Sequence, residues 1–349
     1  MLNRHARILT FALSFPALVV AGAGLSRARP DKTHAIGLEI WRKSLAIGED
    51  VPMRAEMLFT QRRHGKTITT RAHIVQGPKG RYRMEYLLPL EATGRIVFSD
   101  GKANWQFEPG KNILARTTMA PMSEQRDRDL EQLIEGNYEI TLISVNAEAA
   151  GRAAYQISLA PKQPGKSSQR RWIDKKTSKT LRIETHYTDG ILARLVSYDK
   201  VTLPAVVSDT DFLPKRAQSV RTVSTKDDSL YLPTHTIPAS YASLNLKPNS
   251  ALGFELIEIS AGEIDNASAT QFLYSDGIES VSVFAQSMAG SISSIPSNWK
   301  KVAIGSAPGY ENLDGHLDAL TWIHGGCRYT AISHLAPDAL RVFAESQLK

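Results

Sequence analysis

The segment from Arg170 to Asp199 shows the clearest alternation of apolar and polar side chains. From Leu181 to Tyr187 every second residue is apolar, Thr or Tyr, which is the period of a half-buried strand. Asp189 and a glycine follow, and glycine tolerates the positive φ that hairpin turns need. The segment therefore predicts three consecutive antiparallel strands. Their apolar face forms either packed core or the wall of a cavity.

Short extended segments also fill the region before this meander. They are separated by glycine and proline turns with no helix between them, which predicts an antiparallel sheet. The first block comprises residues 53–62, 67–76, 81–88, 95–99, 103–107 and 112–118, and two further strands are expected at residues 138–145 and 153–159.

Helical periodicity precedes and interrupts these strands. Apolar residues from Ile36 to Leu45 recur at helical spacing and predict an amphipathic helix over residues 32–46. Ser123 is a suitable N-cap for a polar helix that runs to Glu135. Because this helix is inserted between two blocks of strands, we expect it on one face of the sheet.

A second unit follows a stretch without periodicity. Residues 214–229 are rich in Ser, Thr and charged side chains, which is typical of a linker. Beyond them, strands are expected at residues 281–284, 317–323 and 327–333. Pro337 suits the first turn of a closing helix.

The N-terminus has the pattern of a secretory signal peptide. Arg4 and Arg7 precede an apolar run over residues 8–20, and small residues follow at 21–24. An N-terminal membrane anchor is the alternative, but the run is short. We therefore expect a cleaved signal peptide and a periplasmic protein.

These patterns together predict two domains. A chain of 349 residues is long enough for two units at roughly 150 residues each. We expect a signal peptide at residues 1–28, a first domain at 29–213, a linker at 214–229 and a smaller α+β domain at 230–349.

Composition narrows the class of partner. The chain is 42% hydrophobic and 22% charged, which is ordinary for a globular protein. Its net charge is +7, and removal of residues 1–28, which hold three Arg and no acidic residue, lowers it to +4. A mildly basic surface permits anionic partners such as lipid head groups or acidic peptides. Scattered Lys and Arg disfavour nucleic acid as a partner.

The single cysteine, Cys327, has a histidine neighbour. If Gly325 and Gly326 form a two-residue hairpin loop, His324 and Cys327 pair directly. A histidine beside a cysteine can lower the thiol pKa and create a nucleophile, so a hydrolase is one hypothesis. The same strand face carries Trp322 and a tyrosine, which favours ordinary core.

Other catalytic and metal-binding patterns are missing from the sequence. A metal set of His316, His324, Cys327 and His334 matches no structural zinc spacing. The sequence has no phosphate-binding glycine loop, no Gly-x-Ser-x-Gly elbow and no His-Glu-x-x-His helix. We therefore expect neither an enzyme nor a cofactor.

Aromatic residues give the candidate ligand site. These side chains form either structural core packed against the helices or the lining of an apolar ligand cavity on the concave face of the sheet. The candidates, all placed on predicted strands of one sheet, are Tyr86, Trp105, Phe107, Trp172 and Tyr187.

Short motifs in a fixed order resemble a known family. The first set is Tyr82–Tyr86, Ser99–Gly101, Trp105 and Pro109. The later set is Ala150–Arg152, Leu159–Pro161, Arg171–Asp174, Leu181–Arg182, Asp189–Gly190, Phe212–Pro214, Tyr274–Phe284 and the stretch from Tyr329 to Pro337. The first set is similar to the open half-barrel of LolA-type lipoprotein carriers, and the later set resembles the MucB/RseB regulators of the sigma-E envelope stress response.

The resemblance implies a LolA-like half-barrel followed by a smaller domain. It also implies a non-enzymatic periplasmic protein that binds the periplasmic domain of an anti-sigma factor. Members of the family are thought to release that partner when lipid, lipopolysaccharide or lipoprotein acyl chains occupy a hydrophobic cavity. A LolA-type carrier or chaperone for lipoproteins or lipids is the alternative.

Overall fold

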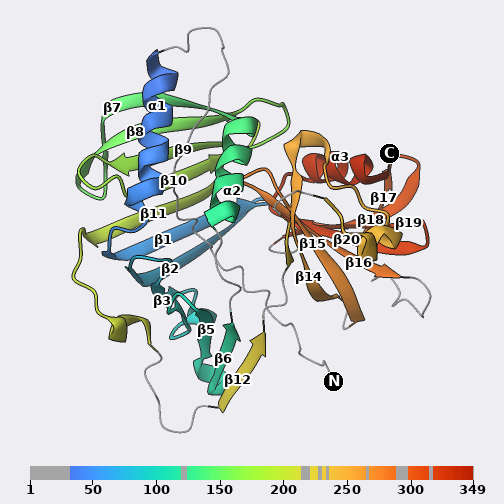
Figure 1. Ribbon diagram of the computed structural model, residues 1–349, viewed down its shortest axis with the longest axis horizontal. Coiled ribbons are helices and arrows are strands. Elements are labelled where there is room, and N and C mark those ends of the chain that lie inside the picture. The colour runs from blue at the N-terminus through green and yellow to red at the C-terminus, as the bar shows by residue number, and fades with distance from the viewer. Residues whose placement is uncertain are drawn as a thin grey trace.

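The fold consists of two largely antiparallel sheets with helices on their faces (Figure 1). It is seen in a computed structural model that describes residues 32–118, 124–213, 221–226, 230–232, 236–264, 267–287, 298–313 and 317–348. The expected signal peptide at residues 1–28 lies outside the described residues.

The first sheet has twelve strands in the order β12-β6-β5-β4-β3-β2-β1-β11-β10-β9-β8-β7. The edge strands β12 and β7 do not meet, so the sheet is an open half-barrel as the sequence predicts. Its strands are β1 (Met53–Arg63), β2 (Lys66–Gln76), β3 (Tyr82–Leu88), β4 (Ile96–Ser99), β5 (Ala103–Glu108), β6 (Ile113–Thr118), β7 (Tyr138–Ala149), β8 (Arg152–Pro161), β9 (Ser168–Asp174), β10 (Thr180–His186), β11 (Leu192–Thr202) and β12 (Arg221–Lys226).

Strand β12 falls inside the stretch expected to be a linker. It pairs in parallel with β6, whereas the other neighbours in this sheet are antiparallel. Thr222 and Val223 are neighbours in β12 and both are exposed, so they show no alternation of buried and exposed positions. Backbone pairing to an open sheet edge forms this strand.

Helices α1 (Lys32–Lys43) and α2 (Glu124–Asn137) lie on one face of the first sheet, across β7–β11 (Figure 1). Trp41 of α1 is fully buried and packs with Ile134 of α2 and Ile157 of β8. Gly37 permits this close approach, because a Cβ there would lie 2.6 Å from the backbone of Leu142. The predicted covering helices are therefore confirmed.

The second sheet has eight strands in the order β13-β14-β15-β16-β20-β19-β18-β17. Helix α3 (Pro337–Leu348) packs on it through Phe343, whose ring meets those of Phe254 and Tyr274 edge to face. The strands are β13 (Leu230–Tyr231), β14 (Glu255–Ile264), β15 (Ala267–Ser275), β16 (Ser280–Ser287), β17 (Lys300–Ile304), β18 (Ala307–Asn312), β19 (Asp318–His324) and β20 (Cys327–Ser333).

Within the described parts of the chain, no helix is long and apolar enough to cross a membrane.

Candidate functional site

A hydrophobic cluster on β1, β2, β3 and β10 is the first candidate for a ligand surface. We call Met53, Met57, Ile74, Met84 and Leu181 the apolar wall, because all are at most 9% exposed and belong to one cluster. Every residue assigned to this cluster lies on a strand or a connecting loop, and α1 and α2 pack instead on a separate cluster. Three flexible methionines give the wall a surface that can adapt to apolar groups of different shape.

The tyrosines beside the wall lie in a water-poor environment. Burial raises the pKa of Tyr82 to about 12. It also raises the pKa of Tyr86, which packs against the wall and is one of the five sequence candidates. Desolvation disfavours a charged phenolate, so both shifts report low polarity at this end of the sheet.

Two other candidates lie on the opposite face of the sheet. Arg83 pairs with Phe98, which pairs with Trp105, while Met84, the neighbour of Arg83, belongs to the apolar wall. Because successive strand residues point to opposite faces, Trp105 faces away from the wall, and so does Phe107 two residues later. The ring of Trp105 stacks on that of Phe98 at 5.8 Å.

The remaining two candidates are separated as well. Trp172 is half-buried, packs against the same hydrophobic cluster as the wall and has the Arg182 guanidinium 5.1 Å from its ring centre. The Tyr187 hydroxyl donates a hydrogen bond of 2.9 Å to the carbonyl of Arg62, at the tip of the β1–β2 hairpin. The five aromatics therefore do not line one cavity, and a ligand role for each stays a prediction.

A buried polar junction joins the two sheets, and sequence reasoning did not find it. Asp276, in the turn between β15 and β16, is fully buried and lies 2.6 Å from the Lys166 ammonium. The Tyr138 hydroxyl donates to Asp276 at 2.7 Å, and Asn137 donates to the Asp276 carbonyl at 3.3 Å. Gly277 completes the fit, since a Cβ there would lie 2.4 Å from Ile134 of α2.

The second part of the junction lies at the tip of the β1–β2 hairpin. Arg63 forms an ion pair with Asp318 of β19 at 2.6 Å, with both side chains buried. Arg63 also donates to the carbonyls of Ser333 and Leu335, at 3.2 and 3.1 Å. The His64 Nε2 lies 2.8 Å from Asp318. One guanidinium thus connects the hairpin to two segments of the second sheet.

His334 lies between the charges of this junction. Its Nδ1 is 3.0 Å from the Gln61 amide and 3.2 Å from Arg63. Burial, and then the nearby Arg194 and Arg63, lower the pKa of His334 to about 3. Arg194 itself pairs with Glu279 at 2.5 Å. Burial raises the pKa of Glu279, an effect that Arg194 opposes.

The His334 environment predicts that acid weakens the folded state. Below pH ~6.5 the His334 imidazole of the unfolded chain binds a proton, whereas that of the folded protein stays neutral down to pH about 3. The free energy of unfolding therefore decreases as the pH is lowered through this range, by at most ~1.4 kcal/mol per pH unit. His334→Gln, which cannot titrate, should remove this component. Urea denaturation of both proteins at several pH values checks it. Glu279 is present in both proteins, so its titration affects both pH profiles equally. Parallel profiles of unfolding free energy would contradict the effect assigned to His334.

The described residues do not form a catalytic arrangement around Cys327 or a metal-binding cluster. His324 and Cys327 pair across the hairpin as predicted, and the rings of Trp322 and Tyr329 stack at 5.3 Å in the core. Cys327 is buried and belongs to the hydrophobic core of the second sheet. No group of three His, Cys, Asp or Glu side chains suited to a metal occurs in the described ranges, which exclude His316.

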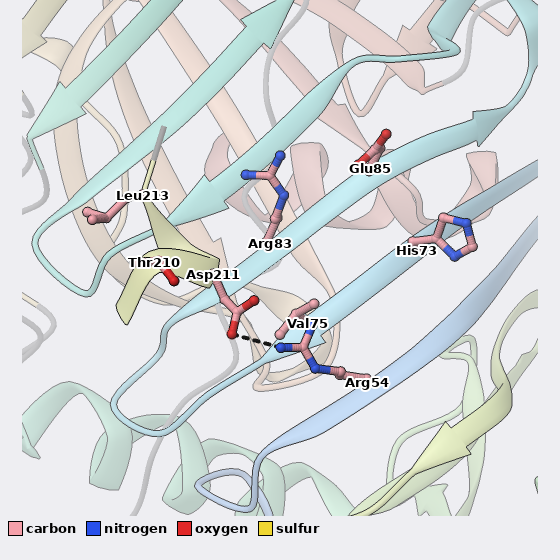
Figure 2. Close-up of a pocket in the computed structure, with 8 residues that line it drawn as sticks. All are labelled: Arg54, His73, Val75, Arg83, Glu85, Thr210, Asp211 and Leu213. Atoms are coloured by element: carbon pink, nitrogen blue, oxygen red, sulfur yellow. Dashed lines mark hydrogen bonds and ion pairs between the residues drawn. The ribbon is translucent and has the colours of Figure 1, made fainter. Parts of the chain in front are cut away.

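A cavity of about 650 Å³ lies on the face of β1–β3 opposite the apolar wall (Figure 2). None of the five aromatic candidates lines it. Six of its eight lining residues have polar side chains, and the full set is Arg54, His73, Val75, Arg83, Glu85, Thr210, Asp211 and Leu213.

Solved structures with the same fold extend over most of the chain. The complex structure of Pseudomonas aeruginosa MucA/MucB aligns with a TM-score of 0.56 at 15% identity, covering 90% of this chain and 97% of that one. A crystal structure of MucB in complex with MucA(peri) aligns with a TM-score of 0.53 at 14% identity, covering 90% and 97%. At these identities the likeness establishes the fold.

Sequence comparison identifies the first domain. Residues 56–215 match the model of the MucB/RseB N-terminal domain. No curated protein matches the chain significantly. The family resemblance expected from the motifs is therefore confirmed over this range.

Proposed function

Because the chain carries a MucB/RseB N-terminal domain, we propose that it is a periplasmic regulatory binding protein. Its partner is the periplasmic domain of a membrane-bound anti-sigma factor. Lipid or lipoprotein acyl chains on the first sheet modulate that binding. The proposal describes a non-enzymatic function and needs no cofactor.

The fold of the whole chain supports the partner. Two of the structures that align over about 90% of the chain are complexes of MucB with MucA, and a third is MucB alone. The alignment thus extends beyond the first sheet to the second sheet, which a simple half-barrel carrier does not require. Fold alone does not define the residues that contact a partner.

The apolar wall is the observation that carries the lipid part. Its five side chains lie on one hydrophobic cluster that α1 and α2 do not join. An acyl chain gains roughly 0.8 kcal/mol for each methylene group that it buries, so a wall of this kind can retain a lipid without charged contacts.

A pull-down from bacterial envelope extract tests the partner. The tagged protein should recover a membrane-anchored anti-sigma factor, and a purified periplasmic fragment of that factor should bind in isothermal titration calorimetry. Recovery of lipoproteins without any anti-sigma factor would favour the LolA-type carrier instead.

Polar substitution of the wall should weaken lipid binding. Met57→Gln combined with Met84→Gln places two amides where an acyl chain would contact apolar side chains, and we expect at least a tenfold loss of affinity for a fluorescent fatty acid. Ile323→Gln, at a 41% exposed position of the second sheet, is the matched control and should bind normally.

Met57→Leu with Met84→Leu separates packing from ligand contact. This pair keeps the apolar volume, so it should retain the fold and most of the binding. Circular dichroism verifies that each variant is folded. Unchanged fatty-acid affinity in the folded Gln variant would exclude the wall as the lipid site.

A further inference from the structure

The cavity opposite the apolar wall has a firmly held roof. Residues 203–213, which we call the strap, leave β11 and cross the outer face of β1–β3. Asp211 in the strap pairs with Arg54 of β1 at 2.8 Å and accepts the Ser208 backbone N–H at 2.8 Å. Phe212 is 1% exposed and packs so closely on Gly77 that a Cβ there would lie 2.7 Å from its ring.

The floor of the cavity is in register across three strands. Arg54, Val75 and Arg83 are direct cross-strand partners on β1, β2 and β3. Their side chains share one face, and Glu85 follows on that face two residues after Arg83 (Figure 2). The cavity thus lies between a paired sheet below and an anchored strap above.

Arg83 is the feature that indicates a ligand. Its side chain lines the cavity and is only 9% exposed, yet no described residue gives its guanidinium a hydrogen bond or an ion pair. The guanidinium carbon lies 5.8 Å from the centre of the Phe98 ring. A buried charge without a counter-ion is costly, and a guanidinium fork matches the oxygens of a carboxylate or phosphate.

The other charges of the cavity define a second requirement. Asp211 already has Arg54 as its partner. Glu85 has no ion pair or hydrogen bond with any residue that the structure describes. Arg83 and Glu85 are spaced by about 6.8 Å along the strand, so two opposite charges face the same space without meeting. A ligand that satisfies both carries an anionic and a cationic group.

We propose that this cavity binds a small zwitterion, with an anionic group on Arg83 and an ammonium group on Glu85. The volume of about 650 Å³ is in the usual range for small-molecule sites. The site goes beyond the proposed function, because it lies on the opposite face of the sheet from the apolar wall. Phosphate–ammonium head groups and peptide termini both offer this chemistry.

Calorimetric titration of the purified protein tests the site with three probes. Phosphoethanolamine and the dipeptide Ala-Ala are zwitterions of the two sources, and inorganic phosphate is an anion alone. At least one zwitterion should bind more tightly than phosphate, and the tighter one identifies the source. Arg83→Gln should weaken that zwitterion at least tenfold, as expected for loss of a charged hydrogen-bonding partner. Glu85→Gln should weaken it too, without weakening phosphate.

Two further variants make the result specific. Arg182→Gln removes a guanidinium that lies over the Trp172 ring on the same sheet, and it should not change binding. Arg83→Lys keeps the charge but loses the fork, so intermediate affinity is expected, and it serves if Arg83→Gln does not fold. Failure of both zwitterions to bind the wild-type protein, or equal affinity in the Arg83 variants, would overturn the proposal. Neither result bears on the anti-sigma partner.

Discussion

Replacing Asp276 by alanine is expected to lower the free energy of unfolding by about 3–5 kcal/mol, because it leaves a buried cation unpaired. Lys166 and Asp276 are at most 1% exposed at their side chains, so water cannot replace the lost carboxylate. Tyr138 would lose its acceptor as well. Urea denaturation followed by tryptophan fluorescence and far-UV circular dichroism measures the loss.

A second Asp-Gly turn supplies the matched control. Asp189 accepts the Ile191 backbone N–H at 2.9 Å, as Asp276 accepts that of Ile278 at 2.9 Å, but Asp189 is exposed. Asp189→Ala should therefore cost only about 1 kcal/mol, the value of a turn hydrogen bond. Equal losses for the two variants would show that Asp276 acts only within its own turn.

A double substitution isolates the ion pair. Lys166→Met with Asp276→Leu removes both charges, so no unpaired charge remains buried. The double variant should lose less stability than Lys166→Met and Asp276→Leu lose in sum when each is made alone. The expected coupling energy is about 1–3 kcal/mol. Additive losses would mean that the two charges do not interact in the folded protein.

The contrast between these turns shows that the sequence predicts the turn itself but not its tertiary contacts. Asp100, Asp189 and Asp276 have the same local chemistry, because each precedes glycine and each accepts backbone N–H groups two residues ahead. Local pattern predicts the turn. Only tertiary packing places Asp276 against α2 and against Lys166 in the β8–β9 loop, and no periodicity encodes that contact.

Strand positions were predictable for a physical reason. In the meander, alternation and turn residues fix each strand to within a few positions, since β9, β10 and β11 end at Asp174, His186 and Thr202. Alternation alone could not separate the aromatic candidates, because Tyr86 and Trp105 are assigned to opposite faces only once the strand register is known. Register depends on pairing between strands, which the period of a single strand does not specify.

Arg63→Met is expected to destabilise the protein by about 3–5 kcal/mol, since it leaves Asp318 buried beside a neutral side chain. The carbonyls of Ser333 and Leu335 lose a donor in the same variant. Denaturation experiments at neutral pH measure the effect. Lysine should rescue it only in part, because an ammonium cannot reach all three acceptors with the geometry of a guanidinium fork.

Arg54→Met tests whether burial of the ion pair is the reason for the large loss of stability expected in Arg63→Met. Arg54 forms an equally direct pair with Asp211 at 2.8 Å, but its side chain is 42% exposed, so its loss should cost at most about 1 kcal/mol. If the two variants lose the same stability, the tip of the β1–β2 hairpin does not hold the sheets together. If only Arg63→Met is severe, the junction couples the first sheet to the second sheet. A ligand that favours one arrangement of the sheets could then alter partner binding by its differential affinity.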